Sequence, residues 1–167
     1  MGIVHVRIDD RLIHGQVATM WTNYLGVNRI MVIDDKAASD DFLKTSLKLA
    51  VPHGIALSVL STEKAADRIN DGKYSGQRVF VILRGVDTLC RLLDLNVYMT
   101  EVNFGNITKT GDRIKIFPTV SLTVGEIKQL KNLQKYHIKL MYQLTPQDEA
   151  ENITSVLDKI ERGGLCK

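Results

Sequence analysis

The sequence has few cysteines and no long apolar segment. Its two cysteines, Cys90 and Cys166, do not have the spacing of a metal-binding pair. No apolar stretch of the secretory type follows the N-terminus, and no segment is long enough to cross a bilayer. We therefore expect a protein of the reduced cytoplasm, which contacts a membrane only through a partner.

The sequence also lacks a strong excess of charge and the common nucleotide motifs. The formal net charge is +3, and Lys and Arg are interspersed with Asp and Glu, so nothing points to a nucleic-acid partner. Neither G-x-G-x-x-G nor G-x-x-x-x-G-K-[ST] occurs, which removes the main support for a dinucleotide or P-loop protein. We expect no cofactor and no metal, whereas a small acidic or phosphorylated partner is compatible with this charge.

Short apolar runs alternate with helix-period segments along the chain. With 44% hydrophobic residues the chain can bury one good core, so we expect a single domain over residues 1–167. Runs such as "VFVIL" and "IMVI" are typical of strands buried on both faces. The pattern predicts an α/β fold, with an open, mainly parallel sheet of about seven strands and helices on both faces. The predicted strands are Ile3–Ile8, Arg29–Ile33, Ile55–Leu60, Val79–Leu83, Glu101–Phe104, Ile114–Phe117 and Lys139–Gln143.

Several helix ends have local signals in the sequence. The first helix is expected to begin near Gly15 and to end at Gly26, a residue suited to the left-handed conformation. Thr123 and Glu126 have the spacing of a capping box. The pair Thr145–Pro146 predicts the N-cap and first position of the last helix.

Polar residues follow several of the predicted strands. In an open parallel sheet, ligands bind beyond the carboxyl ends of the strands, where the strand order reverses. The loop Asp9–His14 follows the first predicted strand, so the active loop is expected there. Neighbouring loops at the same edge are expected to carry Asp34, Asp35, Arg84, Gly85 and the segment Asn103–Asn106.

The stretch "VRIDDRLIHGQVATMW", residues 6–21, contains groups suited to phosphoryl chemistry. His14 supplies an imidazole that is a nucleophile near neutral pH. Arg11 and the free N–H groups of a helix start can hold a phosphoryl dianion, and Gly15 lets the backbone approach it closely. Either Asp9 or Asp10 can accept a hydrogen bond from one ring nitrogen and so fix the tautomer.

Each of these residues also has an ordinary structural role. His14 can be a helix cap or an exposed side chain. Asp9 and Arg11 can form a surface ion pair worth at most ~1 kcal/mol. Asp34 and Asp35 can simply solvate a loop.

The same holds for residues elsewhere in the chain. The segment Asn103–Asn106 is typical of a turn, because Asn and Gly tolerate positive φ. Cys90 is expected in the core. His5 is expected to be a core or edge residue, and His53 and His137 are expected in connections.

Two other protein classes share part of this pattern. A receiver domain has an acid pair after its first strand, as Asp9 and Asp10 are placed, but it needs an aspartate where this chain has Ser61 and Thr62. A metal hydrolase using the two acids and His14 would need more ligands than the loop offers. Both classes are therefore weaker hypotheses.

The opening stretch resembles the phosphorylation loop of one family, the IIB components of the mannose/fructose/sorbose family of the bacterial phosphoenolpyruvate-dependent sugar phosphotransferase system. The resemblance continues through "RIMVIDD", "LKLAVPHGI", "EVNFGN", "TVSLTVGEIKQL" and "HIKL", and so covers nearly the whole chain in register. It implies a cytoplasmic phosphocarrier enzyme, held at the inner face of the membrane through the IIC and IID components.

The resemblance also implies roles for residues of the loop. His14 is phosphorylated on Nδ1 by a phosphohistidine of the IIA component and passes the group to a sugar imported by IIC and IID. Arg11 matches the family arginine that steadies the phosphoryl group, and Asp10 is expected to be the third catalytic residue beside His14 and Arg11. The residues expected to bind phosphate or a partner are Asp9, Gly15, Gln16, Asp35, Asn103 and Gly105.

Some alternatives stay open at this point. The loop can instead belong to a non-catalytic regulatory module that binds phosphate or a sugar phosphate. Asn106 departs from the commoner N-x-G-G, a variant that resembles members handling amino sugars such as N-acetylgalactosamine. A homo-oligomer is possible, and the tail "RGGLCK" with Cys166 can dock, fray or pair.

Overall fold

The computed structural model describes residues 2–161, and seven of their strands form one sheet in the order β3-β2-β4-β1-β5-β8-β9. All neighbours in this sheet are parallel except β8 and β9. This confirms the predicted open, mainly parallel α/β sheet. The strands are β1 (Gly2–Asp9), β2 (Arg29–Ile33), β3 (Ala56–Leu60), β4 (Arg78–Leu83), β5 (Glu101–Asn106), β8 (Lys139–Tyr142) and β9 (Glu151–Asn152).

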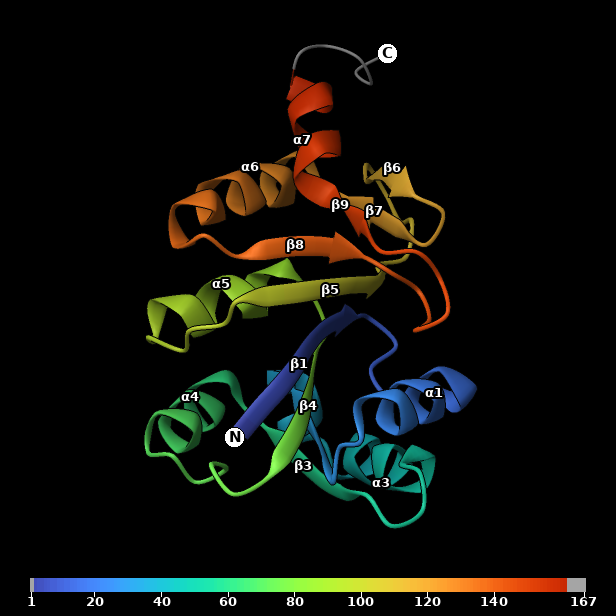
Figure 1. Ribbon diagram of the computed structural model, residues 1–167, viewed down its shortest axis with the longest axis vertical. Coiled ribbons are helices and arrows are strands. Elements are labelled where there is room, and N and C mark those ends of the chain that lie inside the picture. Colours follow the sequence, from blue (N-terminus) through green and yellow to red (C-terminus); the bar gives the residue numbers. More distant parts are fainter. Residues whose placement is uncertain (1, 162–167) are drawn as a thin grey trace.

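Helices cover both faces of the sheet, as Figure 1 shows. One core packs α1, α2 and α3 against Ile30, Val32, Phe80 and Ile82 of the sheet. The other core packs α4, α5, α6 and α7 against the opposite face. The helices are α1 (Gly15–Leu25), α2 (Asp35–Ser39), α3 (Asp41–Ala50), α4 (Thr62–Asn70), α5 (Val86–Asp94), α6 (Val124–Asn132) and α7 (Ile153–Glu161), with a 3-10 turn, η1 (Leu133–Tyr136).

Two predicted helix ends are confirmed. Gly26 ends α1 in the left-handed conformation, with φ 59°. Thr123 and Glu126 form a complete capping box at the start of α6, each side chain bonding the other's backbone N–H.

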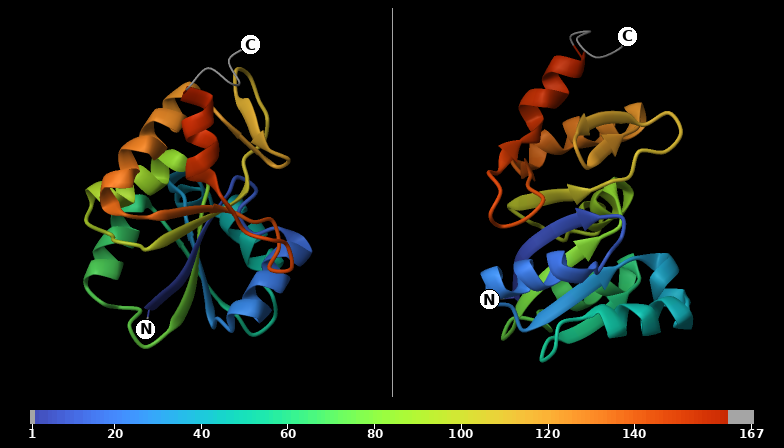
Figure 2. Two further views of the ribbon diagram at one scale, coloured as in Figure 1. Left: turned by 45° about the horizontal axis from the view of Figure 1, so that its top comes forward. Right: turned by 90° about the vertical axis from the view of Figure 1, so that its right-hand side faces the viewer.

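The predicted strand Ile114–Phe117 forms as β6, but it does not join the main sheet. It pairs antiparallel with β7 (Val120–Leu122) in a separate hairpin, which Figure 2 shows beside the sheet. The hairpin touches β5 through a parallel bridge between Ile107 and Val120. The chain turns back directly after β6, so β7 takes its backbone hydrogen bonds, whereas a parallel neighbour in the main sheet would require a longer crossover connection.

The prediction that the last helix begins at Thr145–Pro146 is wrong, because α7 begins at Ile153. The N–H and hydroxyl of Thr145 both donate to Asp148, at 2.7 and 2.8 Å, and this closes a turn. Gln143 Nε2 donates to the carbonyl of Asp148 at 2.8 Å. The chain then pairs β9 against β8 before the helix starts.

The segment Asn103–Asn106 is not a turn, because β5 continues through it. It pairs with β1 on one side, and its first two residues pair with β8 on the other. His5 is half-buried in β1, an interior strand, and stacks on Trp21 with ring centroids 4.6 Å apart. Cys90 packs partly buried against the core, as predicted.

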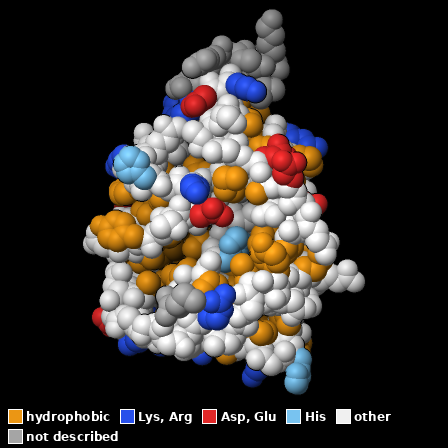
Figure 3. Space-filling view, viewed as in Figure 1, with side chains coloured by type: hydrophobic (Ala, Val, Ile, Leu, Met, Phe, Trp, Pro, Cys, Tyr) orange, Lys and Arg blue, Asp and Glu red, His pale blue; other side chains and the backbone are white. Residues whose placement is uncertain are grey.

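The surface carries mixed charge. On the face seen in Figure 3, Lys and Arg side chains do not gather in a continuous patch. Within residues 2–161, no helix has both the length and the apolar character needed to cross a membrane. The segment that contains Cys166 lies outside the described residues.

Candidate functional site

Loops from several strands meet at the carboxyl edge of the sheet. A crevice of about 540 Å³ opens there, next to the loop that follows β1. The order of the sheet reverses at this point, since β1 lies between β4 and β5. Arg84, after β4, donates to the backbone carbonyl of Asp10 at 3.1 Å and so joins the crevice to the β1 loop.

His14 is exposed and is the N-cap residue of α1. Within the described residues, its side chain makes no capping hydrogen bond, and the first turn of α1 contains no acidic residue. The N–H groups of this turn therefore keep their capacity to bind an anion. Gln16 lies exposed in the same turn.

The loop is shaped by the pattern of its own sequence. Leu12 and Ile13 are each 6% exposed and pack into the core on the α1 face. Their neighbours Arg11 and His14 are exposed on either side. Leu12 has a φ of 60°, and its N–H donates to the carbonyl of Asp9 at 2.9 Å, which closes the turn. Gly15 has a φ of 42°, in the region that favours glycine.

Asp9 holds Arg11 with both carboxylate oxygens. Oδ1 accepts from the backbone N–H of Arg11 at 3.1 Å and from Nε at 3.0 Å, and Oδ2 accepts from Nη2 at 3.1 Å. This pair is not a surface ion pair, because Asp9 is only 1% exposed. The Arg11 side chain keeps 34% of its surface exposed. The buried Asp9 fixes its position, and its exposed side can still contact a partner.

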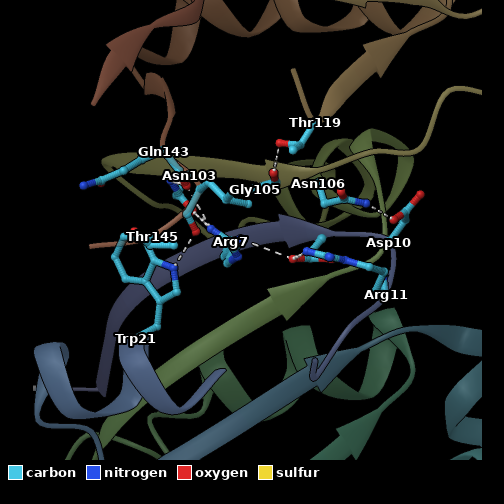
Figure 4. Close-up of polar contacts among 12 residues, drawn as sticks. Arg7, Asp10, Arg11, Trp21, Asn103, Gly105, Asn106, Thr119, Gln143 and Thr145 are labelled. Carbon is cyan, nitrogen blue, oxygen red and sulfur yellow. Dashed lines mark hydrogen bonds and ion pairs between the residues drawn. The ribbon is translucent and has the colours of Figure 1, made fainter. Parts of the chain in front are cut away.

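Arg7 is a site residue that the sequence analysis missed. It is 1% exposed in β1, and Nη2 donates to Asp9 Oδ2 at 3.2 Å. Nη1 donates to Asn103 Oδ1 at 2.6 Å and to the carbonyl of Gln143 at 3.0 Å (Figure 4). Burial lowers the pKa of Arg7, and the neighbouring Asp9 opposes this shift. An arginine inside the apolar run "VHVRI" was the signal available in the sequence.

Gly105 lies against Arg7. A Cβ at this position would stand 1.9 Å from Arg7 Cζ, so any larger residue collides with the guanidinium. Asn103 Nδ2 donates to the same Gln143 carbonyl at 3.0 Å. Asn103 thus contacts both Arg7 and Gln143, the residue after β8, while Gly105 leaves the space that the Arg7 guanidinium fills.

Asp10 fastens the loop to β5. Its Oδ1 accepts from Asn106 Nδ2 and its Oδ2 from the N–H of Thr108, both at 2.7 Å. Its own N–H donates to the carbonyl of Asn106 at 3.0 Å. Asn106 therefore has a structural role, because its side chain and its carbonyl both bond Asp10. The departure from the commoner family pattern did not indicate this role.

Asp34 and Asp35 do more than solvate a loop. Asp34 is buried, caps α2 through the N–H of Ala37 at 2.9 Å, and pairs with Arg84 through both oxygens. Asp35 accepts from the N–H of Thr62 at 2.8 Å and pairs with Arg91. The hydrogen bond from the Thr62 backbone, helped by Arg91, lowers the pKa of Asp35.

The described residues do not bring together a typical metal site. Among residues 2–161, no group of three or more His, Cys, Asp or Glu side chains is placed to hold a metal ion. The carboxylates of Asp9 and Asp10 instead accept hydrogen bonds from arginine, amide and backbone donors.

Known proteins resemble this chain over nearly its whole length. The family model described as "PTS system sorbose subfamily IIB component" matches residues 3–163. The sorbose-specific EIIB component of Klebsiella pneumoniae is 30% identical over 167 residues, which is 100% of each chain. The crystal structure of the IIBSor domain of the sorbose permease from Klebsiella pneumoniae has a TM-score of 0.89 at 31% identity, and the match covers 99% of this chain and 100% of that chain.

A longer protein also matches. The mannose-specific EIIAB component of Escherichia coli (strain K12) is 33% identical over 162 residues, which is 97% of this chain and 50% of that protein. The chain thus spans about half the length of this relative.

Proposed function

The chain belongs to the family of PTS IIB components of the sorbose subfamily, and on this basis we propose that it carries a phosphoryl group on His14 within a sugar phosphotransferase system. The group comes from a phosphohistidine of the IIA component and goes to a sugar that the IIC and IID components import. The protein acts in the cytoplasm, held at the inner face of the membrane by IIC and IID.

The observation that carries this proposal is the exposed His14 at the uncapped start of α1. Donor and acceptor must each approach the same imidazole in line, so the ring has to be accessible from solvent. The helix N–H groups and the positive helix end favour the negative charge of a phosphoryl group beside them. Arg11, fixed by Asp9, supplies a guanidinium from the same loop.

The reaction requires two displacements at phosphorus. Nδ1 of His14 attacks the phosphorus of the donor phosphohistidine, a new N–P bond forms, and the bond to the donor nitrogen breaks. A sugar hydroxyl then attacks the same phosphorus, the bond to His14 breaks, and the hydroxyl proton is released. Such transfers depend on positioning and charge stabilisation more than on covalent help from the protein.

Other residues of the loop hold this arrangement in place. Asp10 fastens the loop to β5, and Gly15 provides the positive φ at the helix start. The names of the relatives, specific for sorbose and for mannose, support a hexose as the substrate.

The test is transfer of label from radiolabelled phosphoenolpyruvate through the general phosphotransferase proteins and the cognate IIA component. We expect acid-labile, base-stable label on the wild type and none on His14→Ala. His53→Ala is the matched control, because His53 is also exposed but lies before β3, at the opposite edge of the sheet. Label on His14→Ala equal to the wild type, or none on the wild type with a competent donor, would contradict the proposal.

The same experiment addresses a non-catalytic regulatory module. Such a module would bind phosphate or a sugar phosphate without a covalent bond, and its mass would not change after incubation with the phosphorylated donor. The phosphocarrier instead gains the mass of one phosphoryl group and loses it when membranes containing IIC and IID are added with the sugar.

A further inference from the structure

Arg7 is an unusual residue for its place in the fold. It lies near the carboxyl end of β1, and its neighbours Val6 and Ile8 point into the apolar core on the other face. Burying a charged group is costly unless it is paired and hydrogen-bonded. At 1% exposure, Arg7 is not available to a phosphorylated partner. Its function must therefore be exerted through the groups it touches.

Those groups come from four parts of the chain, which meet on the buried side of the loop Asp9–His14. The guanidinium donates to Asp9 on β1, to Asn103 on β5 and to the carbonyl of Gln143 after β8. It also lies 5.5 Å from the ring centre of Trp21 on α1. Trp21 in turn donates from Nε1 to the carbonyl of Leu144 at 3.1 Å. The planar fork of the guanidinium fixes these elements relative to one another.

The contact with Asp9 links Arg7 to the loop. Asp9 is shared between two guanidiniums, those of Arg7 and Arg11, so the three groups together carry one net positive charge. With Arg7 absent, the charge of Arg11 would only balance that of Asp9, and the carboxylate would lose the donor that holds it from below. The first change weakens the positive charge that a phosphoryl group on the loop meets, and the second loosens the carboxylate that fixes Arg11.

We propose that Arg7 is a positioning residue for phosphoryl transfer: it holds and partly neutralises Asp9, so that Arg11 is both fixed and left with positive charge for the phosphoryl group. This inference rests on the proposed function of His14 and deepens it. Gly105 is part of the same arrangement as Arg7, Asp9 and Arg11, because only glycine leaves room for the Arg7 guanidinium.

The first test is Arg7→Gln, with Arg29→Gln as the matched control. Arg29 is also a strand arginine with side-chain hydrogen bonds, although only partly buried, and it bonds Gln77 and Ser58, away from the loop. The initial rate of His14 phosphorylation is measured against the concentration of phosphorylated IIA. We expect kcat to fall by roughly 100-fold for Arg7→Gln, the loss that a misplacement of about 1 Å can cause. The KM of Arg7→Gln for phosphorylated IIA should change little. Arg29→Gln should keep a kcat close to that of the wild type.

A double variant separates positioning from a general loss of structure. If Arg7 acts through Arg11, then Arg7→Gln combined with Arg11→Gln is no slower than Arg11→Gln alone. If the two losses multiply, Arg7 does not act through Arg11 and the proposal is overturned. A wild-type rate for Arg7→Gln overturns it as well.

Gly105→Ala tests the same idea while keeping the charge. The added methyl group must displace the guanidinium, so we expect a loss of rate similar to that of Arg7→Gln, with circular dichroism used to confirm folding. Gly76→Ala is the control, because a Cβ at Gly76 has no neighbour within 4 Å. A wild-type rate for folded Gly105→Ala contradicts the proposal even if Arg7→Gln fails to fold.

The two proposals fail in different ways. If His14→Ala is still labelled, the proposed function is wrong. If His14→Ala is unlabelled while Arg7→Gln and Gly105→Ala keep the wild-type rate, the function stands and only the role of Arg7 is wrong.

Discussion

Two pairs of aspartates stand at the same edge of the sheet, and they have different contacts: Asp9–Asp10 lies at the end of β1, and Asp34–Asp35 follows β2. In the second pair, Asp34 turns toward the helix that follows and caps it. In the first pair, both carboxylates turn away from α1, one toward two arginines and the other toward β5. The start of α2 is therefore occupied by a carboxylate, whereas the start of α1 is left for an anion from outside.

Other helices differ from α1 in the same way, because a side chain caps their first turn. Asp40, Ser61 and Thr123 each cap the helix that they precede with a side-chain oxygen. His14 does not cap α1. The difference teaches that an acid pair after a parallel strand does not by itself identify a site. What matters is whether its oxygens fill the helix start or leave it free.

The largest predicted difference between the two pairs is in stability. The side chains of Asp9 and Arg7 are each 2% exposed, so Asp9→Ala leaves a buried arginine without its ion-pair partner. We expect the free energy of unfolding to fall by about 3–5 kcal/mol, the usual cost of breaking a buried pair. Urea unfolding at neutral pH measures it. A loss no larger than that of Asp34→Ala, whose partner Arg84 is part-exposed, would show that burial of the partner arginine does not set the cost.

The second prediction concerns His5, the half-buried histidine of β1. Burial, followed by the nearby Arg7, lowers the pKa of His5 from 6.5 to about 4, and a hydrogen bond with Asn103 opposes the shift. In the unfolded chain His5 is therefore protonated below about pH 6.5, whereas in the folded chain it is protonated only below about pH 4. Stability contributed by neutral His5 is complete above this window and is lost as the pH falls through it.

Urea unfolding at pH 7 and pH 5 checks this prediction. We expect His5 to account for a loss of about 2 kcal/mol between the two, which His5→Phe should remove. His53→Ala, which changes an exposed histidine, should keep the wild-type difference. An unchanged difference in His5→Phe would mean that burial and the nearby Arg7 do not keep His5 neutral.

The smallest predicted effect is that of Asp34→Ala. It removes a helix cap worth about 1 kcal/mol and an ion pair with the part-exposed Arg84, worth at most ~1 kcal/mol. We expect a loss of about 1–2 kcal/mol and a rate of His14 phosphorylation close to that of the wild type. Asp40→Ala removes only a cap, so the difference between the two variants measures the ion pair. A large loss of rate in Asp34→Ala would extend the active site across the crevice.

The sequence was sufficient for much of this fold. Apolar runs and helix caps depend on local chemistry, so β1 to β5, the end of α1 and the capping box of α6 were predicted. The strand Ile114–Phe117 was expected in the main sheet but forms a separate hairpin with β7, because the apolar pattern of a strand does not show which sheet the strand joins. Thr145 carries a real capping signal, but Asp148 uses it to close a turn.

The candidate site was predictable only in part. The sequence could indicate His14 and Arg11, because they share one short loop. It could not show that Arg7 lies beneath them, since that depends on contacts with Asn103 and Gln143. Nor could it show why position 105 is glycine, because the reason is the space taken by a side chain from another strand.

The hydrogen bonds of Arg7 also bear on how the protein is made. They join residues that are 96 and 136 positions apart in the chain. The ribosome releases the loop with His14 early and adds Gln143 much later, and contacts between distant segments form late in folding. A nascent chain therefore contains every residue of the loop Asp9–His14 before the contacts of Arg7 with Asn103 and Gln143 can form. Together with the proposed function, this predicts that a newly made chain accepts its first phosphoryl group only after β8 has docked.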